Sequence, residues 1–313
     1  MEIPVPILRR DAVLAGFTDD ELRGAGWRRV HRGLYVESAD AVGLTVEQRH
    51  HVLTRAVVAA ATSAVTVTHV SAAIVHGLPV WRIPLARVHL SRNRRTGGRV
   101  RRRSVLHSMP IAIDEWVMVD DLPVTTVART VVDLARTVPF EQAVVVGDAA
   151  LRLGTTTRDE LCEQVERAKG RTGRPQASRV VEFLDGRAES PGESRSRVAM
   201  RELKVPSPEL QARILTPTKS VVARVDFLFP DLGVIGEFDG EIKYRSELRG
   251  TLNPEDVVIA EKNREDALRR LGWTVVRWTW RDLDTPHTWL PHLAAEIARN
   301  TPTLGTYLPT PRT

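Results

Sequence analysis

Two acidic side chains interrupt a pair of apolar segments in the last third of the chain. The segment 224–239 reads as two strands joined by a short loop that contains proline and glycine. A four-residue loop would pair Phe229 with Val234. Counting back from that pair places Asp226 directly opposite Glu237. Directly opposite residues share one face of a sheet, where like charges are destabilising.

A divalent cation would compensate for this repulsion, because hard cations such as Mg²⁺ or Mn²⁺ prefer oxygen ligands. Three other arrangements are compatible with the sequence. Asp239, which precedes Gly240, could serve only as a turn residue. Arg224 could form an ordinary cross-strand ion pair with Asp239, or the acidic face could be open to solvent. A register slip of one residue would place Asp226 and Glu237 on opposite faces.

The elements around this hairpin predict a separate domain at residues 190–313. Ser190, Pro191 and Glu193 form a helix start, with serine as the cap and proline at the first helical position. The expected order is helix, three strands, helix, strand, helix. The elements outside the hairpin are a helix from Ser190, a strand that carries Gln211, a helix at 255–271, a strand at 273–278 and a helix at 287–300.

Residues 1–43 predict a small helical unit that ends in a basic hairpin. A helix is expected at 5–15, and Thr18 with Glu21 forms a capping box for a second helix. A strand, tight turn and strand follow at 27–36. This order is typical of a winged helix-turn-helix, although a small packing module with a basic loop is the alternative. The wing would contact DNA through Arg28, Arg29 and Arg32.

Residues 44–189 form an α+β middle region with a helical connector. Its most distinctive feature is an arginine-rich loop around Gly97 and Gly98, which fits either a solvated loop or a flap that binds phosphates. The phosphate contacts would come from Arg101, Arg102 and Arg103. Four histidines of this region lack the spacing of a metal-binding helix, so each is interpreted as structural: His69, His76, His89 and His107.

Composition sets broad limits on the partners and the setting. The chain has 313 residues, enough for two or three domains, and a net charge of +6 with a pI near 9.9 favours a polyanionic partner. A single cysteine, Cys162, excludes an internal disulfide. The start of the chain lacks a signal-like apolar core, and no apolar run fits a membrane span. We therefore expect a cytoplasmic protein without a membrane partner.

The C-terminal pattern resembles the PD-(D/E)XK nuclease superfamily, in particular its branch related to the very-short-patch-repair endonuclease. The resemblance covers roughly the last 120 residues, and it implies a restriction-endonuclease-like αβββαβ fold. It also implies that Asp226 and Glu237 bind Mg²⁺ or Mn²⁺, that Glu193 is a helper acid and that Lys243 is the catalytic lysine. Asp239 occupies the usual place of that lysine, so Lys243 would have to reach the site from beyond the Asp239-Gly240 turn. The motifs that carry the resemblance are Arg224-Val225-Asp226-Phe227, Gly236-Glu237-Phe238-Asp239-Gly240, Lys243-Tyr244 and Glu261-Lys262-Asn263-Arg264-Glu265-Asp266.

The first 145 residues are similar to AbiEi-type antitoxins of type IV toxin–antitoxin systems, which bind promoter DNA and repress their own operon. This likeness implies a winged helix and a possible cognate toxin. The motifs that carry it are Arg32-Gly33-Leu34-Tyr35-Val36, His69-Val70-Ser71-Ala72-Ala73-Ile74-Val75-His76-Gly77-Leu78-Pro79 and Val124-Thr125-Thr126-Val127-Ala128-Arg129-Thr130-Val131-Val132-Asp133.

Two functions follow as expectations. The first is a DNA-binding protein that hydrolyses phosphodiester bonds of double-stranded DNA with Mg²⁺ or Mn²⁺, with Arg264 and Arg270 as further phosphate contacts. The second is a non-catalytic repressor that binds promoter DNA. The sequence leaves the target site, the oligomeric state and the choice between DNA and RNA open.

Overall fold

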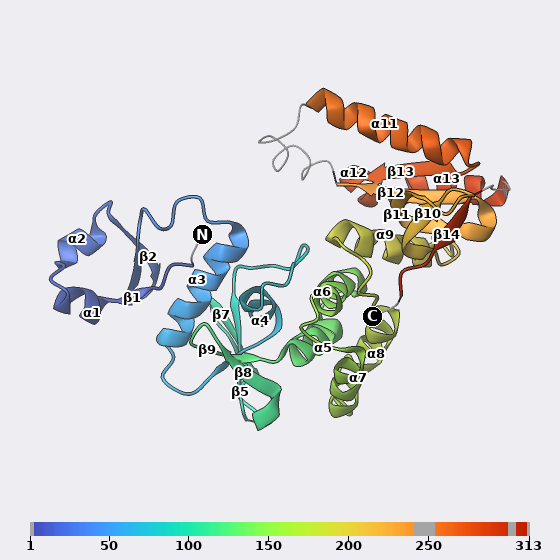
Figure 1. Cartoon of the computed structure of the whole chain (residues 1–313). Coiled ribbons are helices and arrows are strands. Elements are labelled where there is room, and N and C mark those ends of the chain that lie inside the picture. The colour runs from blue at the N-terminus through green and yellow to red at the C-terminus, as the bar shows by residue number, and fades with distance from the viewer. Residues whose placement is uncertain (1–2, 95, 241–253, 300–304, 312–313) are drawn as a thin grey trace. The chain divides into compact units, whose positions relative to one another are not determined.

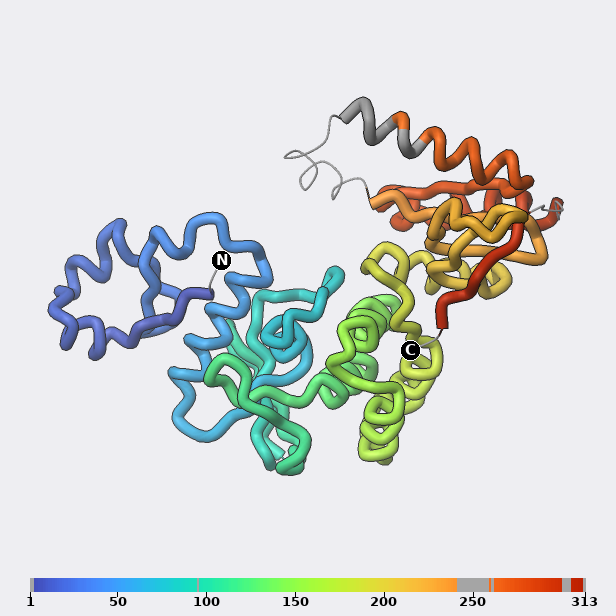
Figure 2. Tube along the Cα trace, viewed as in Figure 1, coloured from blue at the N-terminus to red at the C-terminus, as the bar shows by residue number. Residues whose placement is uncertain are grey.

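The computed structural model describes residues 3–94, 96–240, 254–299 and 305–311, which form two compact units of mixed α/β structure (Figures 1 and 2). The N-terminal unit comprises Met1–Ala150 with Gly154–Phe183, and the C-terminal unit comprises Leu151–Leu153 with Leu184–Thr313. The described residues contain three sheets. None of the helices in these residues is both long and apolar enough to cross a membrane.

The chain begins with a three-stranded sheet of order β1-β3-β2 and two short helices. Thr18 caps the second helix, and the predicted capping box with Glu21 is present. The helix expected from Val5 begins only at Arg9, because the two residues before it pair with the third strand instead. The elements are β1 (Ile7–Leu8), α1 (Arg9–Leu14), α2 (Asp19–Arg23), β2 (Trp27–His31) and β3 (Leu34–Glu37).

The rest of the N-terminal unit is a six-stranded sheet of order β6-β7-β5-β4-β9-β8 with helices around it. Val30 of β2 packs against the core of this sheet, so the first hairpin and the sheet are joined by apolar contacts. The strands are β4 (Thr66–Val67), β5 (Val88–Arg92), β6 (Arg99–Val100), β7 (Ser104–Ser108), β8 (Trp116–Val119) and β9 (Leu122–Thr125). The helices are α3 (Val46–Ala59), α4 (His69–Val75), η1 (Ile113–Glu115), α5 (Val127–Thr137), α6 (Phe140–Arg152), α7 (Arg158–Arg167) and α8 (Arg174–Phe183).

The C-terminal unit has the predicted order of helix, three strands, helix, strand, helix, with one further edge strand. Its sheet order is β13-β12-β11-β10-β14, and only β12 and β13 pair in parallel. The elements are α9 (Pro191–Glu202), β10 (Glu209–Leu215), β11 (Val221–Phe229), η2 (Pro230–Leu232), β12 (Val234–Asp239), α11 (Pro254–Arg270), β13 (Thr274–Thr279), α12 (Trp280–Leu283), α13 (Pro286–Arg299) and β14 (Thr306–Leu308).

Both faces of this sheet are covered by helices, with α11 on one side and α9 on the other in Figure 1. Leu268 of α11 packs with one set of strand residues, including Val225 and Ile235. Met200 of α9 packs with the other set, including Phe227. Strands buried on both faces are expected to be almost wholly apolar, so any acidic residue in them needs a specific partner.

Candidate functional site

The two predicted acids directly follow the last residue pair of the β11–β12 ladder. Phe229 pairs with Val234, as predicted, and the pairs continue back to Phe227 and Gly236. Asp226 and Glu237 are the next residues on their strands. The Asp226 carboxylate reaches across to β12, where Oδ2 accepts a hydrogen bond of 2.9 Å from the backbone N–H of the residue after Glu237.

Glu193 joins these acids from the first turn of α9. The helix starts there because Ser190 caps it and proline follows. Glu193 is only 7% exposed, and its two oxygens accept hydrogen bonds of 2.8–2.9 Å from the Ser190 hydroxyl, the Glu189 backbone N–H and the Gln211 side-chain amide. A close approach holds the helix start in place, since a Cβ on Gly192 would lie 2.0 Å from the ring of Phe238.

Gln211 connects the acids and was not among the predicted site residues. Its amide nitrogen lies 2.8 Å from Oε2 of Glu193 and 3.4 Å from Oδ1 of Asp226. The backbone of Gln211 is left-handed, with φ of 54°. Its neighbours Leu210 and Ala212 would share one face of a regular strand, yet they pack into opposite cores. The alternation of β10 is thus interrupted at Gln211, opposite Asp226.

The only sequence signal for Gln211 is an amide side chain between two apolar residues of a buried strand. In a strand with period-two alternation, Gln211 would be expected on the exposed face, and nothing in the sequence indicates its left-handed backbone. In the structure Gln211 is instead buried, with only 4% of its surface exposed.

Burial sets the electrostatics of the acidic pair. Burial, and next the charge of Asp226, raise the pKa of Glu193 to about 7. Burial also raises the pKa of Asp226, against the lowering effect of its hydrogen bonds from Phe238 and Gln211. The described residues around Glu193 and Asp226 therefore do not fully neutralise the two carboxylates. A bound cation would supply the missing positive charge.

Glu237 has a different environment. Both of its oxygens accept hydrogen bonds from Arg264, at 2.9 and 2.8 Å, and Arg277 lies 3.3 Å away on the neighbouring strand. Burial raises the pKa of Glu237 although both arginines lower it. Arg264, predicted to contact phosphate, is thus an ion-pair partner of Glu237 in this structure.

Arg224 does not pair with Asp239, which was the alternative left open by the sequence. Arg224 instead forms a bidentate pair with Glu189, with both N···O distances at 2.7 Å. Asp239 is exposed at the end of β12. Lys243 lies outside the described residues.

The donor set has the oxygen chemistry of a site for a hard divalent cation. Glu193 and Asp226 offer carboxylate oxygens that share one donor nitrogen, whereas both oxygens of Glu237 accept hydrogen bonds from Arg264. Oxygen-only ligation of this kind suits Mg²⁺ or Mn²⁺ rather than zinc, which prefers nitrogen and sulfur. Asp226 is central because its charge acts on both of the other acids.

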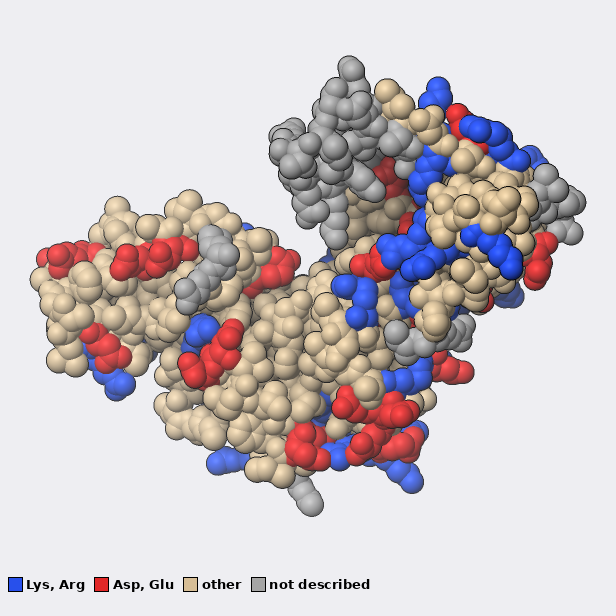
Figure 3. All heavy atoms as spheres, in the orientation of Figure 1, with Lys and Arg blue, Asp and Glu red and all other residues tan. Residues whose placement is uncertain are grey.

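The remaining arginines predicted to bind nucleic acid are all exposed. Figure 3 shows basic side chains gathered on the visible face of the C-terminal unit. The exposed arginines are Arg270 in that unit and Arg28, Arg29, Arg32, Arg101, Arg102 and Arg103 in the N-terminal unit.

Three of the histidines interpreted as separate structural residues lie together in the N-terminal unit. His69 stacks on His107 with ring centroids 4.1 Å apart, and Nε2 of His107 lies 3.1 Å from Nδ1 of His89. Their candidate ligand atoms lie within 4.8 Å of one another. Burial lowers the pKa of each, which favours the neutral form of all three imidazoles. The stacked rings and their mutual hydrogen bond describe a packed neutral cluster.

Two proteins of Mycobacterium tuberculosis are similar to part of this chain. They are the uncharacterized proteins MT2308 and Rv2248, from strains CDC 1551 and H37Rv, and each is 34% identical over 176 residues. The match covers 56% of this chain and 60% of each relative. No protein-family model matches the chain.

Proposed function

We propose that this chain is a DNA-binding protein whose C-terminal unit hydrolyses phosphodiester bonds of double-stranded DNA with a divalent cation. The observation that supports this most strongly is a set of three carboxylates, of which Glu193 and Glu237 are buried and Asp226 is partly buried. The Gln211 amide contacts both Glu193 and Asp226, and the charge of Asp226 acts on both other acids. The finer fold assignments belong to the same proposal. They are a winged helix at the N-terminus and a restriction-endonuclease-like αβββαβ arrangement at the C-terminus.

The chemistry would divide among the residues of the site. Asp226, Glu193 and Glu237 would hold Mg²⁺ or Mn²⁺, which supplies Lewis-acid stabilisation of charge on the phosphate. Without a cation, burial and the charge of Asp226 raise the pKa of Glu193 to about 7, and a bound cation would favour its ionised form by offsetting that charge. Gln211 would orient the two carboxylates through its amide.

Arg264 has a second role in this proposal. A cation that neutralised Glu237 would weaken the attraction that now holds the Arg264 guanidinium. The guanidinium would then be able to contact a DNA phosphate, as its basic helix suggests. The exposed arginines of the N-terminal unit would add contacts that depend on salt and little on base sequence.

Cleavage of duplex DNA by the full chain tests the proposal. We expect cleavage that requires Mg²⁺ or Mn²⁺, stops with chelator, and is lost in Asp226→Asn and Glu193→Gln. Asp231→Asn is a matched control, because Asp231 is an exposed acid in the loop of the same hairpin. Full activity in Asp226→Asn, or equal loss in Asp231→Asn, would contradict the assignment.

One observation favours a second function, a non-catalytic repressor of the AbiEi type with a possible cognate toxin. Arg264 and Arg277 already neutralise Glu237, and Asp239 stands where a lysine is expected. Such a protein would bind promoter DNA equally well with or without chelator, and Arg32→Gln would weaken that binding. A requirement for Mg²⁺ in binding would count against this function.

A further inference from the structure

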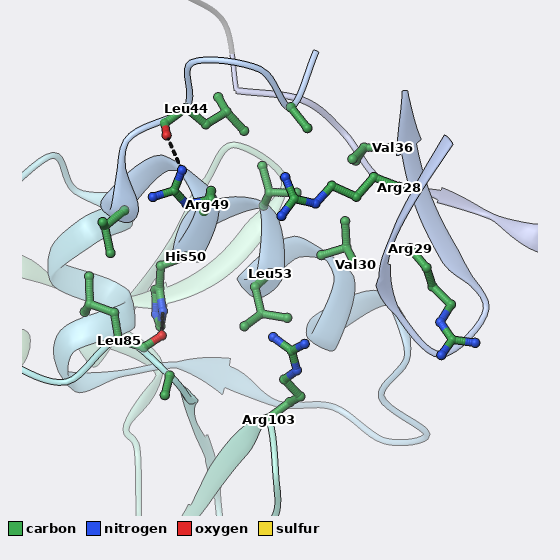
Figure 4. A pocket seen from close by; sticks show the side chains of 14 residues that line it. Arg28, Arg29, Val30, Val36, Leu44, Arg49, His50, Leu53, Leu85 and Arg103 are labelled. Carbon is green, nitrogen blue, oxygen red and sulfur yellow. Dashed lines mark hydrogen bonds between the residues drawn. The ribbon is translucent and has the colours of Figure 1, made fainter. Parts of the chain in front are cut away.

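A cavity of about 420 Å³ lies beside the β2–β3 hairpin, within the N-terminal unit. Small-molecule sites in proteins usually have volumes of roughly 300–1,000 Å³. Its lining comes from the hairpin, from the segment that leads into α3, from α3 itself and from loops before β5 and β7. Figure 4 shows these elements around the cavity.

The polar part of the lining is strongly basic. The lining residues, all of them in the described part of the chain, include no acidic side chain. The guanidinium groups of Arg28 and Arg103 extend from opposite sides toward the space next to Leu53 in Figure 4. Arg49 is held by a hydrogen bond of 2.7 Å to the Leu44 carbonyl. The basic lining residues are Arg28, Arg29, Arg49 and Arg103, together with His50, and in Figure 4 the Arg29 side chain extends away from Leu53 on the far side of the hairpin.

The floor of the cavity is apolar and fixed. Leu53 and Val52 are 6% and 3% exposed, and each belongs to a buried core cluster. His50 is held at both ring nitrogens, 2.8 Å from the Leu85 carbonyl and 2.8 Å from the Ser71 hydroxyl. The floor is therefore preformed, so a ligand would not have to order it.

We propose that this cavity binds a small phosphorylated molecule of the nucleotide class. Arginine guanidinium groups match phosphate oxygens in geometry and charge, and the apolar floor fits an uncharged ring or sugar face. A DNA backbone would also offer phosphates, but it needs no apolar floor behind the arginines. The site lies in a different unit from the carboxylates, and its function does not depend on phosphodiester hydrolysis.

Because Arg28 and Arg29 belong to the hairpin expected to contact DNA, the bound nucleotide would compete with DNA for the same arginines. Saturating nucleotide should therefore weaken duplex binding. This coupling is the same in both directions, so duplex DNA should weaken nucleotide binding by an equal factor.

Calorimetric titration of the full chain with AMP, ADP, GMP and inorganic pyrophosphate tests the proposal, with a 20-base-pair duplex as the alternative source of phosphate. Nucleotide should bind at a single site, and Arg28→Gln and Arg103→Gln should each weaken it about tenfold, the loss of one charge-assisted hydrogen bond. Arg94→Gln is the matched control, since Arg94 is an exposed arginine of the same region outside the lining.

Ala86→Trp provides an independent test. Ala86 is exposed and lines the cavity, so a large side chain at this position would fill the cavity without disturbing the core. It should abolish nucleotide binding and leave duplex affinity unchanged within about twofold. Circular dichroism and thermal unfolding establish that each variant is folded. Absence of binding to all four probes, or equal affinity in Ala86→Trp and the unmutated protein, would overturn the proposal. If Ala86→Trp lost duplex binding but kept nucleotide binding, the cavity would be part of the DNA-binding surface. That result would also overturn the proposal. DNA cleavage assays are unaffected by these outcomes and test the nuclease separately.

Discussion

Replacing Glu193 with glutamine should stabilise the C-terminal unit at neutral pH in the absence of divalent cations. Burial and the charge of Asp226 raise the pKa of Glu193 from 4.5 to about 7 in the folded protein. A carboxyl whose pKa is raised on folding contributes stability that is fully present below pH 4.5 and is lost as the pH rises through about 7. At about 1.4 kcal/mol per pH unit, this difference corresponds to roughly 3 kcal/mol at pH 8.

Glutamine can keep the hydrogen bonds of the site while removing the charge. Its carbonyl oxygen can replace the oxygen that accepts from Gln211 and from the backbone of Glu189, and its amide can donate to the Ser190 hydroxyl. The substitution therefore isolates the electrostatic cost of the second buried carboxylate from the loss of hydrogen bonds.

Scanning calorimetry of the full chain between pH 5 and pH 8 measures the effect. The unmutated protein should lose stability over this range, whereas Glu193→Gln should lose much less and should have a Tm at pH 8 higher by about 5–10 °C. Glu202→Gln, at the exposed end of the same helix, is the control and should follow the unmutated protein. Added Mg²⁺ should raise the Tm of the unmutated protein more than that of Glu193→Gln. The reasoning is refuted if the variant unfolds at or below the unmutated Tm at pH 8.

Four further predictions can be tested, of which three concern the carboxylates of the C-terminal unit and one concerns the N-terminal unit. Gly192→Ala would place a Cβ 2.0 Å from the Phe238 ring, so it should destabilise the C-terminal unit by about 1–3 kcal/mol in urea unfolding and abolish cleavage. Gln211→Leu removes the donor shared by two carboxylates and should slow cleavage by about 10–100-fold with the protein still folded. Arg264→Gln removes a bidentate ion pair to a proposed ligand, so calorimetry should show tighter Mg²⁺ binding, and unchanged affinity would remove that carboxylate from the ligand set. Burial lowers the pKa of His89 from 6.5 to about 4, so the N-terminal unit should lose roughly 3 kcal/mol as the pH falls from 6.5 to 4, detected by circular dichroism during urea unfolding.

The local features of the site could be predicted from the sequence. The contacts between distant segments could not, and they became visible only in the structure. The pairing of Phe229 with Val234 follows from the loop length, and the helix start before Glu193 follows from serine and proline. No local pattern indicates that Arg264 binds Glu237, because that contact depends on how α11 crosses the sheet. The same holds for the three histidines, which converge from α4, β5 and β7 only after the six-stranded sheet has formed.

Backbone strain links the two groups of titratable side chains. Several residues other than glycine have a left-handed backbone in the described part of the chain, and among them only His69 and Gln211 are buried. The others are exposed, and two of them, Asp120 and Asp121, are of a residue type that tolerates a left-handed backbone in turns. Each of these buried residues belongs to one of the two clusters: His69 stacks on His107, and Gln211 contacts Glu193 and Asp226. A strained backbone costs about 1–3 kcal/mol and persists only where surrounding contacts enforce it.

The two strained sites differ in what the strain provides. At Gln211 the left-handed backbone interrupts the alternation of β10, and the side-chain amide reaches both carboxylates from that position. This contact only partly offsets the charge of the pair, because burial still raises the pKa of both acids. At His69 burial favours neutral rings, and the contacts are polar but uncharged: Nδ1 of His69 with the Thr68 hydroxyl, and Nε2 of His107 with Nδ1 of His89. Strain therefore accompanies buried charge at the carboxylates and neutral packing at the histidines, and it is at the carboxylates that we propose a cation acts.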